Sequence, residues 1–246
     1  MKRLENKVII VTGGSGLIGK KIVEQIKNEG GICINADINV QTDSDLQNLY
    51  CDISDENSIQ NVITLVLNKF GKIDGLVNNA YPHTKDWGEK FEDIKFDSWQ
   101  KNVDLQMNSC FLFCQKVLVP MKKQGSGSIV NIASTYGVVS PDFTMYEGTE
   151  MTSPAAYSAI KGGVINFTRY LAAYFGKNGI RANCVSPGGI LDNQNPVFVK
   201  KYEQKVPLKR MGNPSDIAGP VVFLLSDNAA YVTGHNLIVD GGWTII

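Results

Sequence analysis

Two side chains that can move a proton, Tyr157 and Lys161, lie four positions apart in the sequence. On a helix this spacing brings both onto one face. A tyrosine hydroxyl with a pKa of about 10 is a weak base near neutral pH, but a neighbouring ammonium group favours the phenolate and lowers that pKa. The pair predicts a proton donor and acceptor for interconverting an alcohol and a ketone. The alternative is a chance pair on an ordinary surface helix.

A glycine-rich segment near the N-terminus is typical of a nucleotide site. Residues 8–11 form an apolar run that predicts a strand, residues 12–19 contain four glycines, and a helical pattern continues to about residue 28. Between a strand and a helix, such glycines let the backbone approach a pyrophosphate at the helix N-terminus. This order therefore predicts a dinucleotide cofactor.

Asp37 favours NAD over NADP as that cofactor. It ends the next apolar run, residues 32–36, and follows Gly19 by 18 positions. A carboxylate near this spacing accepts hydrogen bonds from the adenosine ribose hydroxyls and would repel a 2′-phosphate. No Lys or Arg follows before residue 69. The alternative is that Asp37 only caps the next loop.

Short apolar runs alternate with helical patterns along the rest of the chain. Strands are predicted at residues 49–53, 73–77, 129–133, 180–185 and 237–239, and helices at 56–70, 99–121, 154–175 and 213–225. This alternation predicts an α/β fold with a doubly wound parallel β-sheet and helices on both faces. Without a linker or repeat, residues 1–246 are expected to form a single domain.

Several local patterns indicate where a site would lie. Ser134 follows a predicted strand, and ligands bind beyond the C-terminal ends of parallel strands. Ser153 and Pro154 predict the N-cap and first position of the helix that carries Tyr157. Residues 190–212 are polar and lack a strong period, which predicts a mobile segment near the site.

Composition excludes several classes of partner. Lys and Arg total 24 and balance 24 Asp and Glu, so charge predicts neither a nucleic-acid nor a membrane partner. The five cysteines show no zinc-type pairing, so no metal site is expected, and their odd number fits a reducing compartment. The apolar run after Arg3 is too short for a signal peptide or a membrane span. We expect a cytoplasmic protein that binds a small molecule.

Taken together, these residues resemble the short-chain dehydrogenase/reductase family in its compact single-domain branch. The matches follow the family's order over nearly the whole chain: residues 12–19, Asp52, Asn78-Asn79-Ala80, Ser134, Tyr157, Lys161, Asn183, Pro187-Gly188, Thr233-Gly234-His235 and Asp240-Gly241-Gly242. The resemblance implies a Rossmann-type fold, NAD or NADP as cofactor, and a homodimer or homotetramer. The chain is also loosely similar to members from surface-sugar and flagellin-glycan pathways.

The resemblance also implies roles for individual residues. Tyr157 would be the general acid/base, Lys161 would lower its pKa and bind the nicotinamide ribose, and Ser134 would stabilise the developing oxyanion. The hydride would pass directly between the substrate carbon and the nicotinamide. The residues expected to bind the dinucleotide are Gly13, Ser15, Gly16, Leu17, Ile18, Gly19, Asp37, Asp52, Ile53, Asn79, Ala80, Tyr157, Lys161, Pro187, Gly188 and Ile190. For Asp52, a cap on the helix that begins near Asp55 is the alternative.

Two departures from the family pattern keep other readings open. Leu17 stands where compact members usually have glycine, and the resulting spacing is more similar to the extended branch, which handles nucleotide-sugars. An NAD-retaining sugar epimerase or dehydratase is therefore an alternative, and a non-catalytic nucleotide-binding scaffold is another. Gln106 stands where the family's catalytic Asn holds a proton-relay water; it is expected to act with a longer arm, unless Asn102 or Asn108 does so instead.

Two further departures concern the substrate. Tyr81 replaces the usual glycine after Asn-Asn-Ala and puts an aromatic ring near the nicotinamide end. The chain between Ser134 and Tyr157 is longer than usual, and the extra residues 144–152, which include Glu147, are rich in hydroxyls and carboxylates. Such groups suit a polyhydroxylated substrate, a sugar or sugar derivative, better than a fatty chain. We expect Tyr81, Ser134, Glu147 and Tyr157 to contact substrate; the alternative is that the insert is a plain lid or an oligomer contact.

Overall fold

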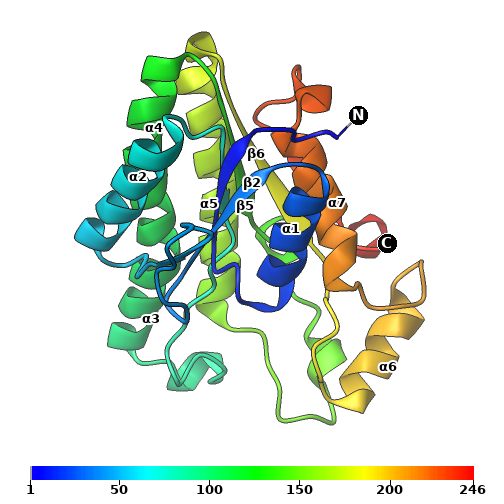
Figure 1. Ribbon diagram of the computed structural model, residues 1–246. Helices are drawn as coiled ribbons and strands as arrows, with labels where there is room; N and C mark the ends of the chain where they lie inside the picture. Colours follow the sequence, from blue (N-terminus) through cyan, green and yellow to red (C-terminus); the bar gives the residue numbers. More distant parts are fainter. Residues whose placement is uncertain (1) are drawn as a thin grey trace.

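The computed structural model describes residues 2–246, which form one seven-stranded sheet in the order β3-β2-β1-β4-β5-β6-β7 (Figure 1). All six neighbouring pairs are parallel. The strands are β1 (Val8–Thr12), β2 (Ile32–Asp37), β3 (Asn48–Tyr50), β4 (Gly75–Asn78), β5 (Gly127–Ile132), β6 (Ile180–Pro187) and β7 (Asn236–Val239). The strand order reverses between β1 and β4, so the prediction of a Rossmann-type doubly wound sheet is confirmed.

Helices cover both faces of the sheet, which explains why the strands read as continuous apolar runs. Helices α2, α4 and α5 pack on one face and α1 and α7 on the other, each over its own buried cluster (Figure 1). The helices are α1 (Leu17–Asn28), α2 (Glu56–Phe70), α3 (Phe96–Val103), α4 (Ser109–Gln124), α5 (Ala155–Phe175), α6 (Pro196–Lys205) and α7 (Pro214–Leu225). All five cysteines are free and buried, as small core residues.

The start of α5 differs from the prediction. Pro154 occupies the N-cap position without a side-chain cap, and the helix begins at Ala155. Ser153 is therefore not the N-cap; it is buried one position earlier. Proline at the N-cap has a fixed φ but no side-chain acceptor, so the first turn of α5 has no side-chain cap. Ser153 is left free to point elsewhere.

The segment of residues 190–212, which lacks a strong sequence period, nevertheless contains a helix, and its mobility stays a prediction. Half of it is the helix α6, which begins where the Asn195 side chain accepts a hydrogen bond from Val197 N. Phe198 and Tyr202, one turn apart, are buried on a small cluster below the sheet. This short helix buries only two apolar side chains and is otherwise rich in lysine. Two residues are too few to show a helical period in the sequence.

The helix predicted at residues 99–121 is interrupted by one π-helical turn. It consists of α3, the π turn Asp104–Asn108, and α4. A π turn inserts one extra residue into the helical ladder and often occurs at functional sites. Here it carries Gln106, whose side chain is buried.

Candidate active site

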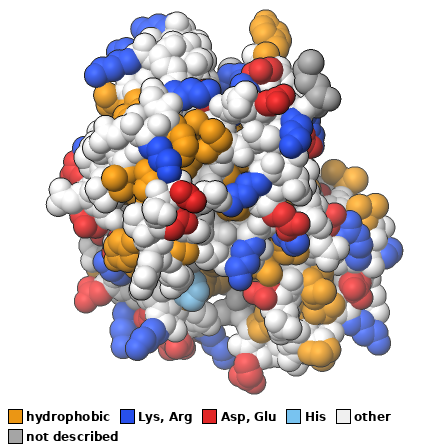
Figure 2. Space-filling model, viewed as in Figure 1, with side chains coloured by type: hydrophobic (Ala, Val, Ile, Leu, Met, Phe, Trp, Pro, Cys, Tyr) orange, Lys and Arg blue, Asp and Glu red, His pale blue; other side chains and the backbone are white. Residues whose placement is uncertain are grey.

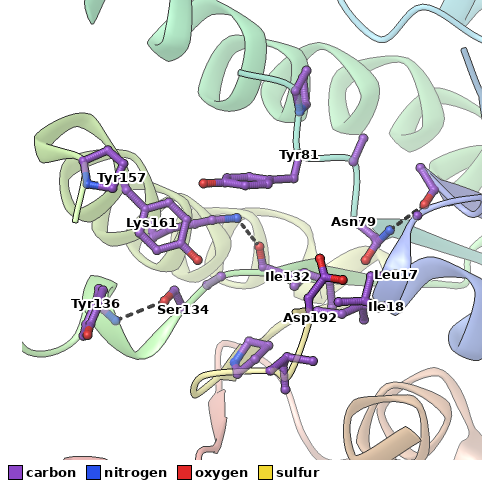
Figure 3. Close-up of a pocket in the computed structure, with 18 of the residues that line it drawn as sticks. Leu17, Ile18, Asn79, Tyr81, Ile132, Ser134, Tyr136, Tyr157, Lys161 and Asp192 are labelled. Carbon is purple, nitrogen blue, oxygen red and sulfur yellow. Dashed lines mark hydrogen bonds between the residues drawn. The ribbon is translucent and has the colours of Figure 1, made fainter. Parts of the chain in front are cut away.

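The C-terminal ends of the strands open into a cavity of about 830 Å³. Its walls come from the ends of β1, β2, β4, β5 and β6, the starts of α1 and α5, and the segment before α6 (Figure 3). This is where ligands bind in open parallel sheets, and the volume is that of a site for a cofactor together with a small substrate.

No helix within residues 2–246 is long and apolar enough to cross a membrane. Across those same residues, no cluster of His, Cys, Asp and Glu could hold a metal ion.

The glycine loop is built for close backbone approach. Gly13 has φ +63°, and a Cβ there would lie 2.7 Å from Ala80 Cα; a Cβ on Gly19 would lie 2.1 Å from Gly13 O. Asn79 ties this loop to β4, because its Nδ2 donates to Thr12 O (3.1 Å) and Gly13 O (2.9 Å). Only glycine fits the two crowded positions.

The start of α1 fits the phosphates of a dinucleotide. The first amides of a helix have no intrahelical acceptor and carry partial positive charge. Leu17 and Ile18, which form this first turn, line the cavity. Gly19 does not line it and instead allows the helix to pack on the loop. The other predicted cofactor residues all line the cavity: Gly13, Ser15, Gly16, Asp37, Asp52, Ile53, Asn79, Ala80, Tyr157, Lys161, Pro187, Gly188 and Ile190.

Two carboxylates line the cavity beside the ends of β2 and β3, where we expect the adenosine. Asp37 is buried and its two oxygens accept from Ser15 N (2.9 Å) and Asn39 N (2.8 Å), so it orders both loops around it. Asp52 accepts from the amide and hydroxyl of Ser54. The cap of α2 is Asp55, so the alternative that Asp52 caps this helix is excluded.

Ser134, Tyr157 and Lys161 meet at the end of β5 (Figure 3). Ser134 Oγ accepts a hydrogen bond from Tyr136 N (3.1 Å), which leaves its own proton free to donate. Lys161 Nζ donates to Ile132 O, the last residue of β5, at 2.8 Å. This bond fixes α5 against the strand end and so fixes Tyr157 beside Ser134.

Burial dominates the proton affinities of this group. It raises the pKa of Tyr157, while the hydrogen bond with Ser134 acts in the opposite direction. Burial also lowers the pKa of Lys161 to about 8. The ammonium is directed to Ile132 O and lies 5.7 Å from the centre of the Tyr157 ring. That Lys161 lowers the pKa of Tyr157 therefore stays a prediction.

Gln106 faces a second, water-sized cavity of about 20 Å³ that Lys161, Thr12 and Asn78 also line. Neither polar atom of its side chain has a hydrogen-bond partner within residues 2–246. A polar cavity of this size holds one water molecule. Asn102 instead holds the 82–96 loop through Thr84 and Ser98, and the exposed Asn108 donates to Asp104. Of the three candidate amides, only Gln106 lines this cavity.

Tyr81 forms an aromatic wall above Lys161 (Figure 3). Its ring centre lies 5.5 Å from Lys161 Nζ and 5.6 Å from the Tyr157 ring, which it meets edge to face. Its hydroxyl accepts from Trp87 Nε1 at 2.7 Å. The exposed His83 stacks on Trp87 with ring centres 5.9 Å apart. The sequence did not predict the contact between Trp87 and Tyr81, because only the folded loop brings the two side chains together.

The structure does not bring Glu147 to the cavity. Its side chain is exposed and faces Lys201 at 3.7 Å. The preceding residue, Tyr146, lines the cavity, together with Met151 and Thr152 of the same insert and the following Ser153. Sequence reasoning missed Tyr146 and four further lining aromatics, which are Tyr136, Phe198, Tyr202 and Trp243. The sequence shows that these aromatic residues exist, but it does not show that they meet in one cavity.

Comparisons with known proteins give consistent matches over the whole chain. Residues 15–244 match the family model described as enoyl-(acyl carrier protein) reductase. Post-translational flagellin modification protein A of Campylobacter coli is 38% identical, over 98% of this chain and 99% of that protein. The 7alpha-hydroxysteroid dehydrogenase of Bacteroides fragilis is 33% identical, over 100% of this chain and 97% of its own. A short chain dehydrogenase from Leptospira borgpetersenii, solved with bound NAD+, is 37% identical, covers 98% and 94% of the two chains, and superposes with a TM-score of 0.89.

Proposed function

The chain belongs to the short-chain dehydrogenase/reductase family, and from this premise we propose that it uses NAD to interconvert a secondary alcohol and a ketone on a sugar or sugar derivative. As a member it is an NAD(P)-dependent oxidoreductase of small molecules. The observation that carries the proposal is Tyr157 beside Ser134 and Lys161 at the edge of the cavity. We also propose that residues 1–246 act as one domain, because one sheet supplies both the cofactor end and the catalytic end.

The geometry supports distinct roles for the three side chains. Ser134 keeps its proton for the substrate oxygen, because its Oγ already accepts from Tyr136 N. Burial raises the pKa of Tyr157, so the phenol is protonated at neutral pH and can donate to a ketone oxygen. The reverse reaction requires the phenolate, which the nearby Lys161 ammonium favours. A bound nicotinamide supplies or accepts the hydride.

Substitution of the phenol tests this mechanism. We expect Tyr157→Phe to lower turnover by about 10²–10⁴, the usual contribution of a general acid/base, and to leave dinucleotide binding unchanged. Turnover is followed by NADH absorbance with a panel of free and modified sugars, and binding by NADH fluorescence. Tyr231→Phe, at a fully exposed tyrosine, is the matched control. Turnover that survives in Tyr157→Phe would contradict the mechanism.

The same assay separates the second candidate reaction. The glycine spacing at positions 13, 16 and 19 motivates an NAD-retaining epimerase or dehydratase. A product lighter by one H₂, with matching growth of NADH, supports the dehydrogenase. A changed product without net NADH, measured by mass spectrometry, supports the alternative. The chain covers nearly all of its matched dehydrogenase relatives, which favours the first outcome.

Gln106 is proposed to hold a water that carries protons between Lys161 and solvent. Gln106→Leu should lower turnover at least tenfold, because a bare apolar side chain cannot orient that water. It should not lower the melting temperature, since Gln106 makes no hydrogen bond to residues 2–246 that the change would remove. Asn108→Leu, at an exposed amide in the same π turn, is the control. A variant that loses stability and activity together would indicate a purely structural role.

Asp37 supports NAD as the preferred cofactor. Its buried carboxylate lines the cavity at the end of β2, where we expect the adenosine ribose. Lys161 is the one Lys or Arg that the described residues contribute to the cavity wall. Like charges at short range in a partly buried site repel strongly. We expect the ratio of kcat/KM for NAD over NADP to exceed tenfold and to fall about tenfold in Asp37→Asn. A wild-type preference for NADP would overturn this assignment.

An apolar face on α4 and α5 supports a symmetric homodimer or homotetramer. Phe111, Val119, Tyr170 and Tyr174 are all about half exposed there or more. Large exposed apolar patches mark interaction sites, and closed symmetry is the rule for such assemblies. Analytical ultracentrifugation at micromolar concentration should therefore give twice or four times the 27.0 kDa of one chain. A monomer would refute the assembly.

The free, buried cysteines support the proposal of a cytoplasmic protein.

A further inference from the structure

The substrate end of the cavity is formed by the insert, defined here as residues 142–153, together with α6. Lys201 Nζ of α6 donates to two carbonyls of the insert, Thr144 O and Glu147 O, both at 2.8 Å. Lys205 pairs with Asp142. Beneath these contacts, apolar side chains of both segments form one buried cluster with Trp243. The insert is therefore a fixed wall of the cavity, and Figure 1 shows it passing below the sheet to reach α6.

This wall presents hydroxyl groups. Tyr146 lines the cavity; its hydroxyl lies 3.3 Å from that of Tyr136, and its ring stacks on Phe198 with centres 5.4 Å apart. Ser153 lines the cavity too and is 8% exposed, but its Oγ is enclosed. This hydroxyl lies close to that of Tyr146, and their hydrogen bonding opposes the rise that burial causes in the pKa of the phenol. Ser153 is therefore placed to orient the Tyr146 hydroxyl.

The same end lacks groups for an anion. Among the described residues that line the whole cavity, Lys161 is the single cation. Four basic residues of and after α6 are used elsewhere, and the exposed Lys200 does not line the cavity. Lys201 and Lys205 bind the insert, Lys209 donates to Gln204 O, and Arg210 pairs with Asp216. Over the visible face, charges of both signs are mixed without a basic patch (Figure 2).

Three backbone amides at this end do not replace the missing cations. Gly188 N donates to Val239 O and Gly189 N to the Tyr202 hydroxyl at 2.7 Å. Tyr136 N donates to Ser134 Oγ. These three amides are therefore already satisfied, and the uncapped first turn of α5 is the remaining source of backbone donors at this end. The three amides contrast with the start of α1, where the free amides of a helix N-terminus can bind a pyrophosphate.

Resting on the proposed function, we propose that the substrate is an uncharged molecule with at least one hydroxyl group away from the reacting carbon, that Tyr146 binds this hydroxyl, and that Ser153 orients Tyr146. Phosphorylated and nucleotide-linked sugars fit this end less well, because no cationic side chain other than Lys161 lines the cavity among the described residues. Neutral hydroxyls can both donate to and accept from a substrate hydroxyl. Burial raises the pKa values of Tyr136 and Tyr146, so both stay neutral at physiological pH.

The test compares matched substrates and matched variants. The substrates are free hexoses, their 6-phosphates, UDP-glucose, cyclohexane-1,2-diol and cyclohexanol. We expect the wild-type kcat/KM for a free hexose to exceed that for its phosphate at least tenfold. Tyr146→Phe and Ser153→Ala should each lower kcat/KM for the diol about tenfold relative to cyclohexanol. Glu147→Gln, at the exposed neighbour in the same insert, should change neither.

Other outcomes would overturn the proposal. If kcat/KM for the hexose 6-phosphate or for UDP-glucose equals or exceeds that for the free hexose, the substrate is not restricted to uncharged molecules. An equal loss on the diol and on cyclohexanol makes Tyr146 and Ser153 structural residues only. A clear preference for the monohydroxylated ring refutes the distal hydroxyl. If one variant fails to fold, the other variant and the wild-type panel still decide.

Failure of the proposed function gives a different pattern. If no substrate yields NADH although NAD binds, the dehydrogenase proposal fails. Calorimetry on the NADH-loaded protein then measures binding of a free hexose against its 6-phosphate without turnover. Tighter binding of the free hexose, weakened in Tyr146→Phe, supports the inference by itself. Tighter binding of the phosphate contradicts it.

Discussion

The active site depends on one hydrogen bond, from the buried ammonium of Lys161 to Ile132 O at the end of β5. A buried charge is costly unless it is paired, and here a strand-end carbonyl provides the partner. Because Lys161 lies one turn beyond Tyr157 on α5, the bond also sets the position of the phenol. Ser134 follows β5 directly, so one interaction brings the helix and the strand end into the register that the chemistry needs.

The glycine loop imposes a similar constraint on the cofactor end. Gly13 lies against Ala80, and Asn79 binds the loop backbone, so β1 and β4 are joined at the point where the strand order reverses. This contact leaves no room for side chains. The first turn of α1 and the end of β4 therefore border the same cavity that holds Tyr157, which is how one sheet serves both binding and catalysis.

The substrate end is more specific to this chain. It is assembled from the insert, α6 and Trp243, which are separated in sequence and meet in one buried cluster. Two lysines of α6, Lys201 and Lys205, bind the insert. Composition alone would have assigned them to solvent or to an anionic ligand. The distribution of charge in the cavity therefore follows from the packing of α6 and could not be read from the overall balance of charges.

The sequence by itself determined the sheet and most of its helices, and it predicted residues for the cofactor and catalytic ends that line one cavity in the structure. These features depend on local signals. Such signals are a glycine at a crowded turn, an apolar run, and a Tyr and Lys one helical turn apart. Each predicts the same local structure whatever the rest of the chain does. Only the tertiary structure decided that Tyr146 rather than Glu147 lines the cavity, that residues 190–212 contain α6, and that Gln106 lines a water-sized space. Those outcomes depend on which face of a segment meets distant residues, and no local spacing carries that information.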